Sequence, residues 1–346
     1  MNDIIQKLKK AELTGRGGGA FPTGKKWEIV KKTKADKKYV VCNASEGEPG
    51  VGKDWYILDK YGGRVIDGMK IALDYLGADK AFLYLNPDYY FDFKEELEKI
   101  IGNAPIEIFR KPYQAGYVGG EESSALNALE HERIEPRLRP PFPTTSGLYA
   151  RPTLINNVET FYDVSLIARD EYEKKRFITI SGIAKHEKVF FLKEHWTIEI
   201  ILKHTNNWPD FDFFVQVGGN ASGQVLHSTQ LKQPISGSGL ITIYDMTKEN
   251  PIDLIKTWVD FFMNESCGQC TPCREGTLRL HEILKQKNPN WKMFSSLLNT
   301  LHDTSFCGLG RAVPIPIRSY VNNVLSKKKK HNINISKEEH ELIKAV

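Results

Sequence analysis

The first part of the chain alternates short apolar runs with longer stretches of helical periodicity. Runs with the length of buried strands occur at residues 39–42, 81–85 and 106–109. Apolar residues at helical spacing follow them at 64–75, 91–101 and 123–130. Strands and helices in this alternation predict an α/β fold with a parallel sheet and helices on both faces. In such sheets ligands bind beyond the carboxyl ends of the strands, so the loops there are the first place to look for a site.

The pattern changes near residue 176 and again near residue 251. Short runs rich in β-branched and aromatic residues predict strands at 177–180, 189–192, 213–217 and 241–244, with a helix at 198–202. They predict a small α+β module of the β-grasp (ubiquitin-like, SLBB-like) type. Apolar stripes then predict a four-helix bundle with helices at 252–264, 275–286, 291–301 and 315–325. We therefore expect three domains, at 1–172, 173–248 and 249–346.

Four of the five cysteines have the spacing of metal ligands. Three lie in one tight run with two residues between neighbouring cysteines, and the fourth is distant. They are Cys267, Cys270, Cys273 and Cys307. Four thiolates in this pattern favour a cubane iron–sulfur cluster, although four soft ligands also suit tetrahedral zinc. Both groups fall at connections between predicted helices, where one end of a bundle brings them together. The fifth, Cys42, lies in an apolar run and is expected to be a buried strand residue.

Composition limits the kind of protein this is. The 346 residues are 40% hydrophobic and 26% charged, which is typical of a globular protein with ample core. We expect no membrane helix and no secretory signal, and thiolates at cluster spacing indicate a reducing cytoplasm. The formal charge of +5 comes partly from basic runs at 31–38 and 327–330. No nucleic-acid motif accompanies them, so we interpret them as solvated surface and a basic tail.

A glycine-rich stretch at 15–27 is a candidate phosphate-binding loop. Closely spaced glycines let peptide N–H groups converge on an anion, and Arg16, Lys25 and Lys26 add positive charge. The spacing is not that of a dinucleotide fingerprint, and a helical segment rather than a strand precedes it. A flexible linker is the alternative, but large aromatics such as Trp27 are unusual in linkers.

Two acidic loops lie at expected carboxyl ends of strands. One carries Glu46 and Glu48, and the other carries Glu121 and Glu122. Carboxylates accept hydrogen bonds from ribose or ribityl hydroxyls, so a phosphate cradle with acidic loops nearby suits a dinucleotide or a flavin nucleotide. Solvated turns are the alternative. A proline-rich segment at 135–157 is interpreted as a functional loop or a rigid domain connection.

In chain order, these segments carry seven motifs: GRGG-x-x-FPTG-x-KW, CN-x-x-EGEPG, Y-x-x-GEE, PRL-x-PPFP, NNVET, ESCG-x-CTPCREGT and FCGLG. Together they resemble the NADH-binding flavoprotein subunit of respiratory complex I and the related diaphorase subunits of NAD-linked hydrogenases and formate dehydrogenases. The resemblance runs from about Gly15 to Cys307. It implies a Rossmann-like domain that binds FMN and NADH, and a [4Fe–4S] cluster in the helical bundle.

The resemblance also implies the site residues. Those expected around FMN are Gly15, Arg16, Gly17, Gly18, Lys26, Asn43, Glu46, Tyr117, Gly120, Glu121, Asn156 and Asn157. Those expected to line the NADH site are Phe21, Glu48, Glu122, Arg139 and Phe142. The implied cluster ligands are Cys267, Cys270, Cys273 and Cys307. Carboxylates at the ribose would repel the extra phosphate of NADPH, so NADH is expected to be preferred.

The implied activity is NADH:acceptor oxidoreduction, in which hydride passes between NAD(H) and FMN and single electrons then leave through the cluster. No side-chain nucleophile is required. The expected partners are a thioredoxin-like [2Fe–2S] subunit and a larger redox complex, with membrane attachment only through partners. The chain departs from the family pattern at Gly19–Ala20, Ile29, Ser45 and Gly119. An NAD-insensitive relay or structural subunit and a zinc-stapled binding module are the alternatives.

Overall fold

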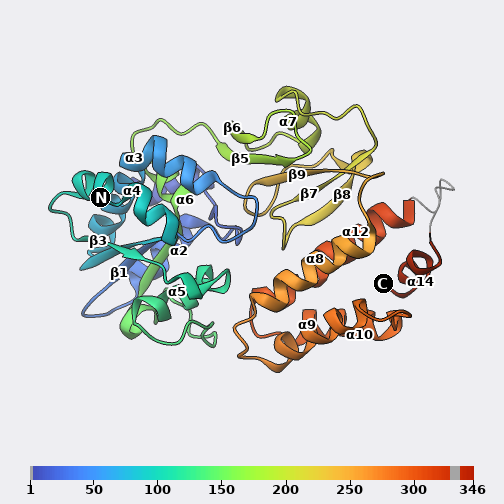
Figure 1. Ribbon diagram of the computed structural model, residues 1–346. Helices are drawn as coiled ribbons and strands as arrows, with labels where there is room; N and C mark the ends of the chain where they lie inside the picture. The colour runs from blue at the N-terminus through green and yellow to red at the C-terminus, as the bar shows by residue number, and fades with distance from the viewer. Residues whose placement is uncertain (1–2, 328–335) are drawn as a thin grey trace. The chain divides into compact units, whose positions relative to one another are not determined.

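The computed structural model describes residues 3–327 and 336–346, which form two compact units (Figure 1). The first consists of the described residues up to Gly47 together with Val51–Phe177 and Phe191–Glu194. The second consists of Glu48–Gly50, Ile178–Phe190 and the described residues from His195 onward. Apart from Lys327, the predicted basic tail at 327–330 lies outside the described residues.

The first unit is built on a four-stranded parallel sheet with the strand order β3-β2-β1-β4. Its strands are β1 (Tyr39–Ala44), β2 (Lys80–Leu85), β3 (Ile106–Arg110) and β4 (Thr153–Asn157). The helices are α1 (Asp3–Lys10), α2 (Thr23–Lys32), α3 (Lys53–Leu76), α4 (Pro87–Ile101), α5 (Glu122–Leu129) and α6 (Val158–Ala168). The prediction of an α/β fold with a parallel sheet is confirmed.

Both faces of this sheet are covered. Val41, Phe82 and Ile155 pack with Leu126 and Leu129 of α5 on one face. Since side chains alternate along a strand, the neighbouring residues point to the other face, where α3 and α6 pack against β1 and against each other. Each large aliphatic or aromatic side chain buried in this way contributes about 1.5–3 kcal/mol.

The strand order places a crevice at the carboxyl ends of β1 and β4. From β1 the chain proceeds to β2 and β3 on one side, and β4 then pairs with β1 on the other side. The direction of winding therefore reverses between β1 and β4. This is the point in an open α/β sheet where the loops diverge and leave room for a ligand.

Three sequence predictions in this unit are wrong in detail. The prolines predict a loop over 135–157, but β4 occupies Thr153–Asn157. The helix expected from residue 64 begins at Lys53, because it continues through a distortion at Tyr61 where φ is −137°. The glycine spacing predicts one loop over 15–27, but α2 begins at Thr23.

The second unit holds a mixed five-stranded sheet with the order β6-β5-β9-β7-β8. Its strands are β5 (Lys175–Gly182), β6 (Lys188–Lys193), β7 (Phe213–Val217), β8 (Gln224–His227) and β9 (Leu240–Asp245), with α7 at Ile198–His204. β9 is parallel to β5 and antiparallel to β7. The four predicted strands are present, and β8 is an addition that the pattern does not predict.

The rest of the second unit is helical. It comprises α8 (Pro251–Asn264), α9 (Thr271–Leu284), α10 (Trp291–Thr304), α11 (Gly308–Ala312), α12 (Pro314–Tyr320), a π-helical turn at Val321–Leu325, and α14 (Lys337–Ala345). α9 packs on both α8 and α10, and α12 packs on β8. Within the described residues no helix is both long and apolar enough to cross a membrane.

Candidate functional site

Two asparagines lie side by side at the carboxyl ends of β1 and β4. Asn43 and Asn157 are partners in the parallel register, and Asn157 is also the N-cap of α6. The Asn157 Nδ2 donates to the Asn43 carbonyl oxygen at 3.3 Å. The Asn43 Nδ2 donates to the carbonyl oxygen of Gly120 at 2.9 Å. These bonds tie the loop before α5 to the crevice that the strand order predicts.

The glycine-rich loop closes on itself beside this crevice. The Gly15 N–H donates to the Phe21 carbonyl oxygen at 2.9 Å, and Gly18 adopts a φ of 102° that favours glycine. A β-carbon placed at Gly17 would lie 3.3 Å from the Asn157 Cβ, whereas at Gly18 or Gly19 it would meet nothing within 4 Å. Among the described residues, the N–H groups of Gly17, Gly18 and Gly19 have no hydrogen-bond partner. Consecutive open N–H groups of this kind fit an anionic phosphate.

The side chain of Arg16 is engaged by other protein groups. It is 2% exposed, and its guanidinium pairs with Asp163 at 3.1 Å and Glu194 at 2.6 Å. Burial raises the pKa of Asp163 to about 8, with Arg16 opposing the increase. The Arg16 N–H donates to the Thr160 Oγ1 at 3.0 Å, so both the backbone and the side chain of Arg16 anchor the loop.

The acidic side chains near the crevice bind protein groups. Glu46 caps α3 by accepting from the N–H groups of Asp54 at 2.8 Å and Trp55 at 3.1 Å. Glu121 caps α5 by accepting from the N–H groups of Ser123 and Ser124, each at 3.0 Å. Carboxylates at helix N-termini stabilise the helix, so these residues have a structural role in addition to any ligand contact.

Positive charge reaches the crevice from α2 and from the proline-rich segment. The Lys26 Nζ pairs with the Glu122 carboxylate and donates to the Ile155 carbonyl oxygen at 2.7 Å, which uses two of its three N–H groups. Arg139 pairs with Glu121. The structure thus joins Lys26 to Glu122 and Arg139 to Glu121, residues that the motifs place in one site.

The remaining predicted residues are more dispersed. Phe21 and Phe142 are 44% and 54% exposed, so each presents an aromatic face to solvent. The Asn156 amide is buried and, with the carboxamide turned to satisfy both partners, accepts from the Trp27 indole N–H at 3.0 Å. Tyr117 lies beside Gly47, where a β-carbon would come within 3.3 Å of the Tyr117 Cα.

In the second unit, Glu48 is held by the loop after β7. Its carboxylate accepts from the N–H groups of Ala221 at 2.8 Å and Ser222 at 3.0 Å, and from the Ser222 Oγ at 2.9 Å. A β-carbon at Gly219 would lie 2.2 Å from the Glu48 Oε1, so only glycine fits there. A cavity of about 640 Å³ lined by residues 208–213, Ser228 and Thr229 contains none of the predicted site residues.

Three of the four clustered cysteines lie at helix starts in the second unit, and Cys267 lies in the loop before α9. Cys270 is the N-cap of α9, Cys273 lies in its first turn, and Cys307 is the N-cap of α11. Burial and the neighbouring thiols of Cys270, Cys307 and Cys267 raise the pKa of Cys273 to about 11. The positive ends of helices favour nearby thiolates and so oppose this increase, which fits a group that binds and neutralises the thiolates.

The packing around Cys273 brings the two cysteine segments together. A β-carbon at Gly310, three residues after Cys307, would lie 3.1 Å from the Cys273 Cβ and 2.3 Å from the Ser305 Oγ. The Cys267 loop turns at Gly268, where φ is 78°. Within residues 3–327 and 336–346, however, no group of three or more histidine, cysteine or carboxylate side chains is arranged to hold a metal ion.

Comparisons with known proteins cover both regions. Residues 8–166 match the model of the Nuo51 FMN-binding domain, and residues 253–331 match that of the NADH-ubiquinone oxidoreductase-F iron-sulfur binding region. The NADP-reducing hydrogenase subunit HndC of Solidesulfovibrio fructosivorans is 32% identical over 95% of this chain and 76% of its own length. The F subunit of the NADH-quinone oxidoreductase of Aquifex aeolicus is 31% identical over 89% and 81%. The chain belongs to the family of NADH-quinone oxidoreductase F subunits and related hydrogenase subunits.

Solved structures agree with this family assignment. The crystal structure of an NAD+-reducing [NiFe]-hydrogenase in the H2-reduced state superposes with a TM-score of 0.84 at 26% identity, over 97% of this chain and 67% of that one. Together with the two matching models, this confirms the predicted family and a flavin- and iron–sulfur-dependent oxidoreductase subunit. The iron–sulfur match favours the cluster over zinc.

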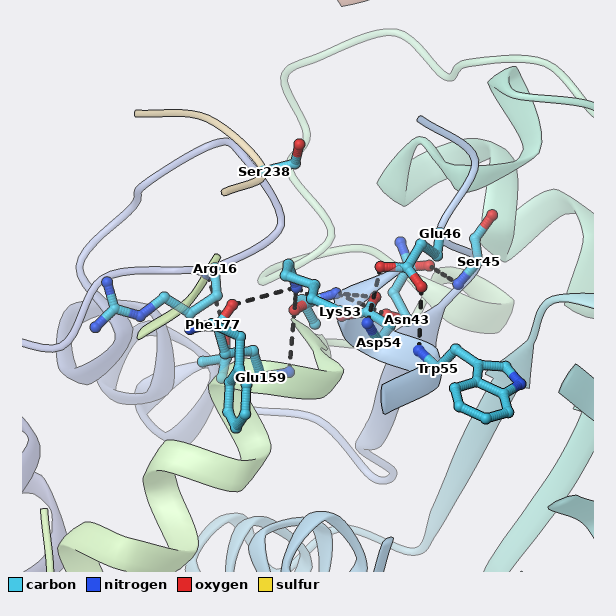
Figure 2. A network of polar contacts seen from close by, with 12 residues as sticks. Arg16, Asn43, Ser45, Glu46, Lys53, Asp54, Trp55, Glu159, Phe177 and Ser238 are labelled. Atoms are coloured by element: carbon cyan, nitrogen blue, oxygen red, sulfur yellow. Dashed lines mark hydrogen bonds and ion pairs between the residues drawn. The ribbon is translucent and has the colours of Figure 1, made fainter. Parts of the chain in front are cut away.

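Sequence reasoning missed a buried group that this oxidoreductase subunit places beneath the crevice. Lys53, Asp54 and Glu159 are each at most 2% exposed and lie together (Figure 2). Burial opposes the charge of Lys53, but the carboxylates of Asp54, Glu159 and Glu46 outweigh it and raise the Lys53 pKa. Charged residues normally indicate a surface, so no periodic pattern identifies them. The signal that was available is the Lys53-Asp54 pair, which follows the EGEPG motif after two intervening residues.

Proposed function

We propose that the chain is an NADH dehydrogenase (diaphorase) module that holds FMN in the first unit and a [4Fe–4S] cluster in the second. When bound, FMN accepts a hydride from NADH and passes on electrons singly, which lets a two-electron donor supply a one-electron carrier. The observation that carries the proposal is the run of open N–H groups at Gly17–Gly19, beside the crevice between β1 and β4. It lies within the segment that matches the FMN-binding model.

The residues proposed to hold FMN keep unused hydrogen-bond capacity. Gly17, Gly18 and Gly19 offer peptide N–H groups to the phosphate. Lys26 keeps one N–H beyond those given to Glu122 and Ile155. Asn43 gives one N–H to Gly120 and keeps a second.

The nucleotide site is proposed to use the exposed aromatic faces of Phe21 and Phe142 and the carboxylate of Glu122. A carboxylate accepts hydrogen bonds from ribose hydroxyls and repels a 2′-phosphate, which favours NADH over NADPH. Because one relative is a subunit of an NADP-reducing hydrogenase, this preference is the part of the proposal that most needs a direct measurement.

In the second unit, Cys267, Cys270, Cys273 and Cys307 are proposed as the four cluster ligands. The five-stranded sheet is proposed to be a β-grasp domain, and α8, α9, α10 and α12 a four-helix bundle that carries the cluster. Relatives of the chain are subunits of larger redox complexes. We propose a thioredoxin-like [2Fe–2S] subunit as the immediate partner and the cytoplasm, where thiolates stay reduced, as the location.

The proposal is tested on the purified full chain by cofactor analysis and steady-state kinetics. We expect about one FMN and about four iron atoms per chain after reconstitution. Reduction of ferricyanide should be faster with NADH than with NADPH. A chain that binds no flavin would contradict the proposal. A flavin-loaded chain that reduces ferricyanide with neither nucleotide would favour the relay alternative.

A further inference from the structure

Lys53 lies at the centre of a buried set of polar contacts. Its Nζ donates to the Asp54 Oδ1 at 2.6 Å and to the Asn157 Oδ1 at 3.0 Å. The Glu159 carboxylate adds an ion pair at 3.2 Å, so the buried ammonium has two carboxylates beside it (Figure 2). Because Lys53 is 2% exposed, losing any of these partners would leave a buried charge poorly compensated.

The side-chain carboxamide of Asn157 uses all of its hydrogen-bonding capacity within the protein. Its Oδ1 accepts from the Lys53 Nζ and from the Glu159 N–H, each at 3.0 Å. Its Nδ2 donates to the Asp54 Oδ2 at 2.7 Å and to the Asn43 carbonyl oxygen at 3.3 Å. A carboxamide has two donors and two lone pairs, so none remains for a ligand. In this arrangement Asn157 contributes no side-chain hydrogen bond to a flavin.

Asn157 instead fixes the position of groups that have capacity to spare. A β-carbon at Gly17 would lie 3.3 Å from the Asn157 Cβ, so the glycine-rich loop packs against this side chain. The bond to the Asn43 carbonyl oxygen connects this side chain to the end of β1. The orientation of the Asn157 amide is therefore coupled to the position of the loop.

We propose that Lys53 and Asn157 form a positioning pair for the flavin phosphate loop. Lys53 locks the orientation of the Asn157 carboxamide, and Asn157 in turn holds Gly17 against the ends of β1 and β4. Neither side chain is a ligand of the flavin. The inference rests on the proposed function, because it concerns the loop proposed to hold FMN.

A double-mutant cycle on FMN binding tests the pair. Dissociation constants are measured by quenching of FMN fluorescence with FMN-free full chain, for wild type, Lys53→Met, Asn157→Ala and the double variant. Because both changes disrupt the same contact, each should weaken binding about tenfold, and the double variant should be no weaker than the weaker single variant. Lys60→Met is the matched control, since Lys60 lies on the same helix, is 57% exposed and should not change the affinity.

A second readout separates positioning from fold stability. All constants are measured well below the melting temperature of each variant, and the visible circular dichroism of bound FMN should change in the same way in both single variants. If Lys53→Met does not fold, Lys53→Met with Asp54→Asn replaces it, because this pair removes one buried charge of each sign. The reference for the cycle is then Asp54→Asn.

The possible results are distinguishable. Effects that multiply in the double variant, or melting temperatures that fall with no change in affinity or dichroism, would overturn the positioning pair. Wild-type protein that binds no FMN would instead refute the proposed function, and the inference with it.

Discussion

The protonation of Glu46, which caps the start of α3, should make the stability of the fold depend on pH. Burial, and then the neighbouring carboxylate of Asp54, raise its pKa from 4.5 to about 7. The folded state therefore binds more protons than the unfolded state between these values, and the associated stability is lost as pH rises through the folded pKa. We expect Glu46→Gln to flatten the dependence of the urea midpoint on pH between about pH 5 and 8 in FMN-free chain.

Some pH dependence should remain in that variant, because the pKa of Asp163 is also raised, to about 8, with the same sign. Urea titrations at several pH values measure both chains under identical conditions. If the variant and the wild type show the same slope, Glu46 does not hold a proton in the folded state at neutral pH.

Glu122 is the residue at which nucleotide preference is most directly testable. Its carboxylate pairs with Lys26, so Glu122→Gln removes a negative charge and also releases the ammonium. Both changes favour a 2′-phosphate. We expect the ratio of kcat/KM for NADPH to that for NADH to rise about tenfold. The exposed Glu132→Gln should leave the ratio unchanged, and an unchanged ratio in Glu122→Gln would remove Glu122 from the nucleotide site.

At the scale of elements, the crossing of α3 and α6 depends on one glycine. A β-carbon at Gly68 would lie 2.0 Å from the Phe161 carbonyl oxygen, so the two backbones touch there. We expect Gly68→Ala to destabilise the chain by about 1–3 kcal/mol. Gly63→Ala on the same helix meets nothing within 4 Å and should stabilise by about 0.5–1 kcal/mol. Urea unfolding measures both, and equal midpoints for Gly68→Ala and wild type would contradict the close crossing.

Substitution of single cysteines tests which of them bind the cluster in the second unit. Replacing any one of the four proposed ligands by alanine should abolish the broad visible absorbance of the reconstituted chain and lower its iron content. The four ligands are Cys267, Cys270, Cys273 and Cys307. The buried Cys42 in β1 is the matched control, since Cys42→Ala should keep the cluster. Iron and sulfide analysis checks each variant. Full iron content in any of the four would remove that cysteine from the ligand set.

Helices and strands whose apolar residues repeat at a clear spacing could be predicted from the sequence, and those without such a repeat could not. β1, β2 and β3 stand out as apolar runs between polar loops. The sequence pattern did not predict α6, because Glu159 and Asp163 interrupt its apolar face. These two carboxylates are buried because they pair with Lys53 and Arg16. β4 was hidden among prolines that suggested a loop.

The candidate site shows the same division. Its glycines, carboxylates and cysteines belong to recognisable motifs, so they could be named from the sequence. The contacts that occupy the Arg16 guanidinium and the Asn157 amide could not be predicted from the sequence, because they depend on which helices pack together. The fold determines which donors and acceptors already have a partner within the protein. Only the structure therefore shows which motif residues still have a hydrogen-bonding group available for a ligand.

At the scale of the whole molecule, a flavin-binding match and an iron–sulfur match occur in one chain. A flavin takes up a hydride and releases single electrons, and an iron–sulfur cluster carries such electrons onward one at a time. We therefore expect NADH to reduce both centres of the same chain, the cluster through the flavin. Variants in the cluster region offer a control, because they should leave the flavin response intact.

The most direct test is an anaerobic optical titration with NADH of the full chain loaded with FMN, iron and sulfide. We expect bleaching of the flavin band together with loss of the broad cluster absorbance, and flavin bleaching alone in Cys307→Ala. Flavin and cluster bands that dithionite reduces but NADH leaves unchanged would contradict it. That result would identify the chain as an electron relay that does not respond to NADH.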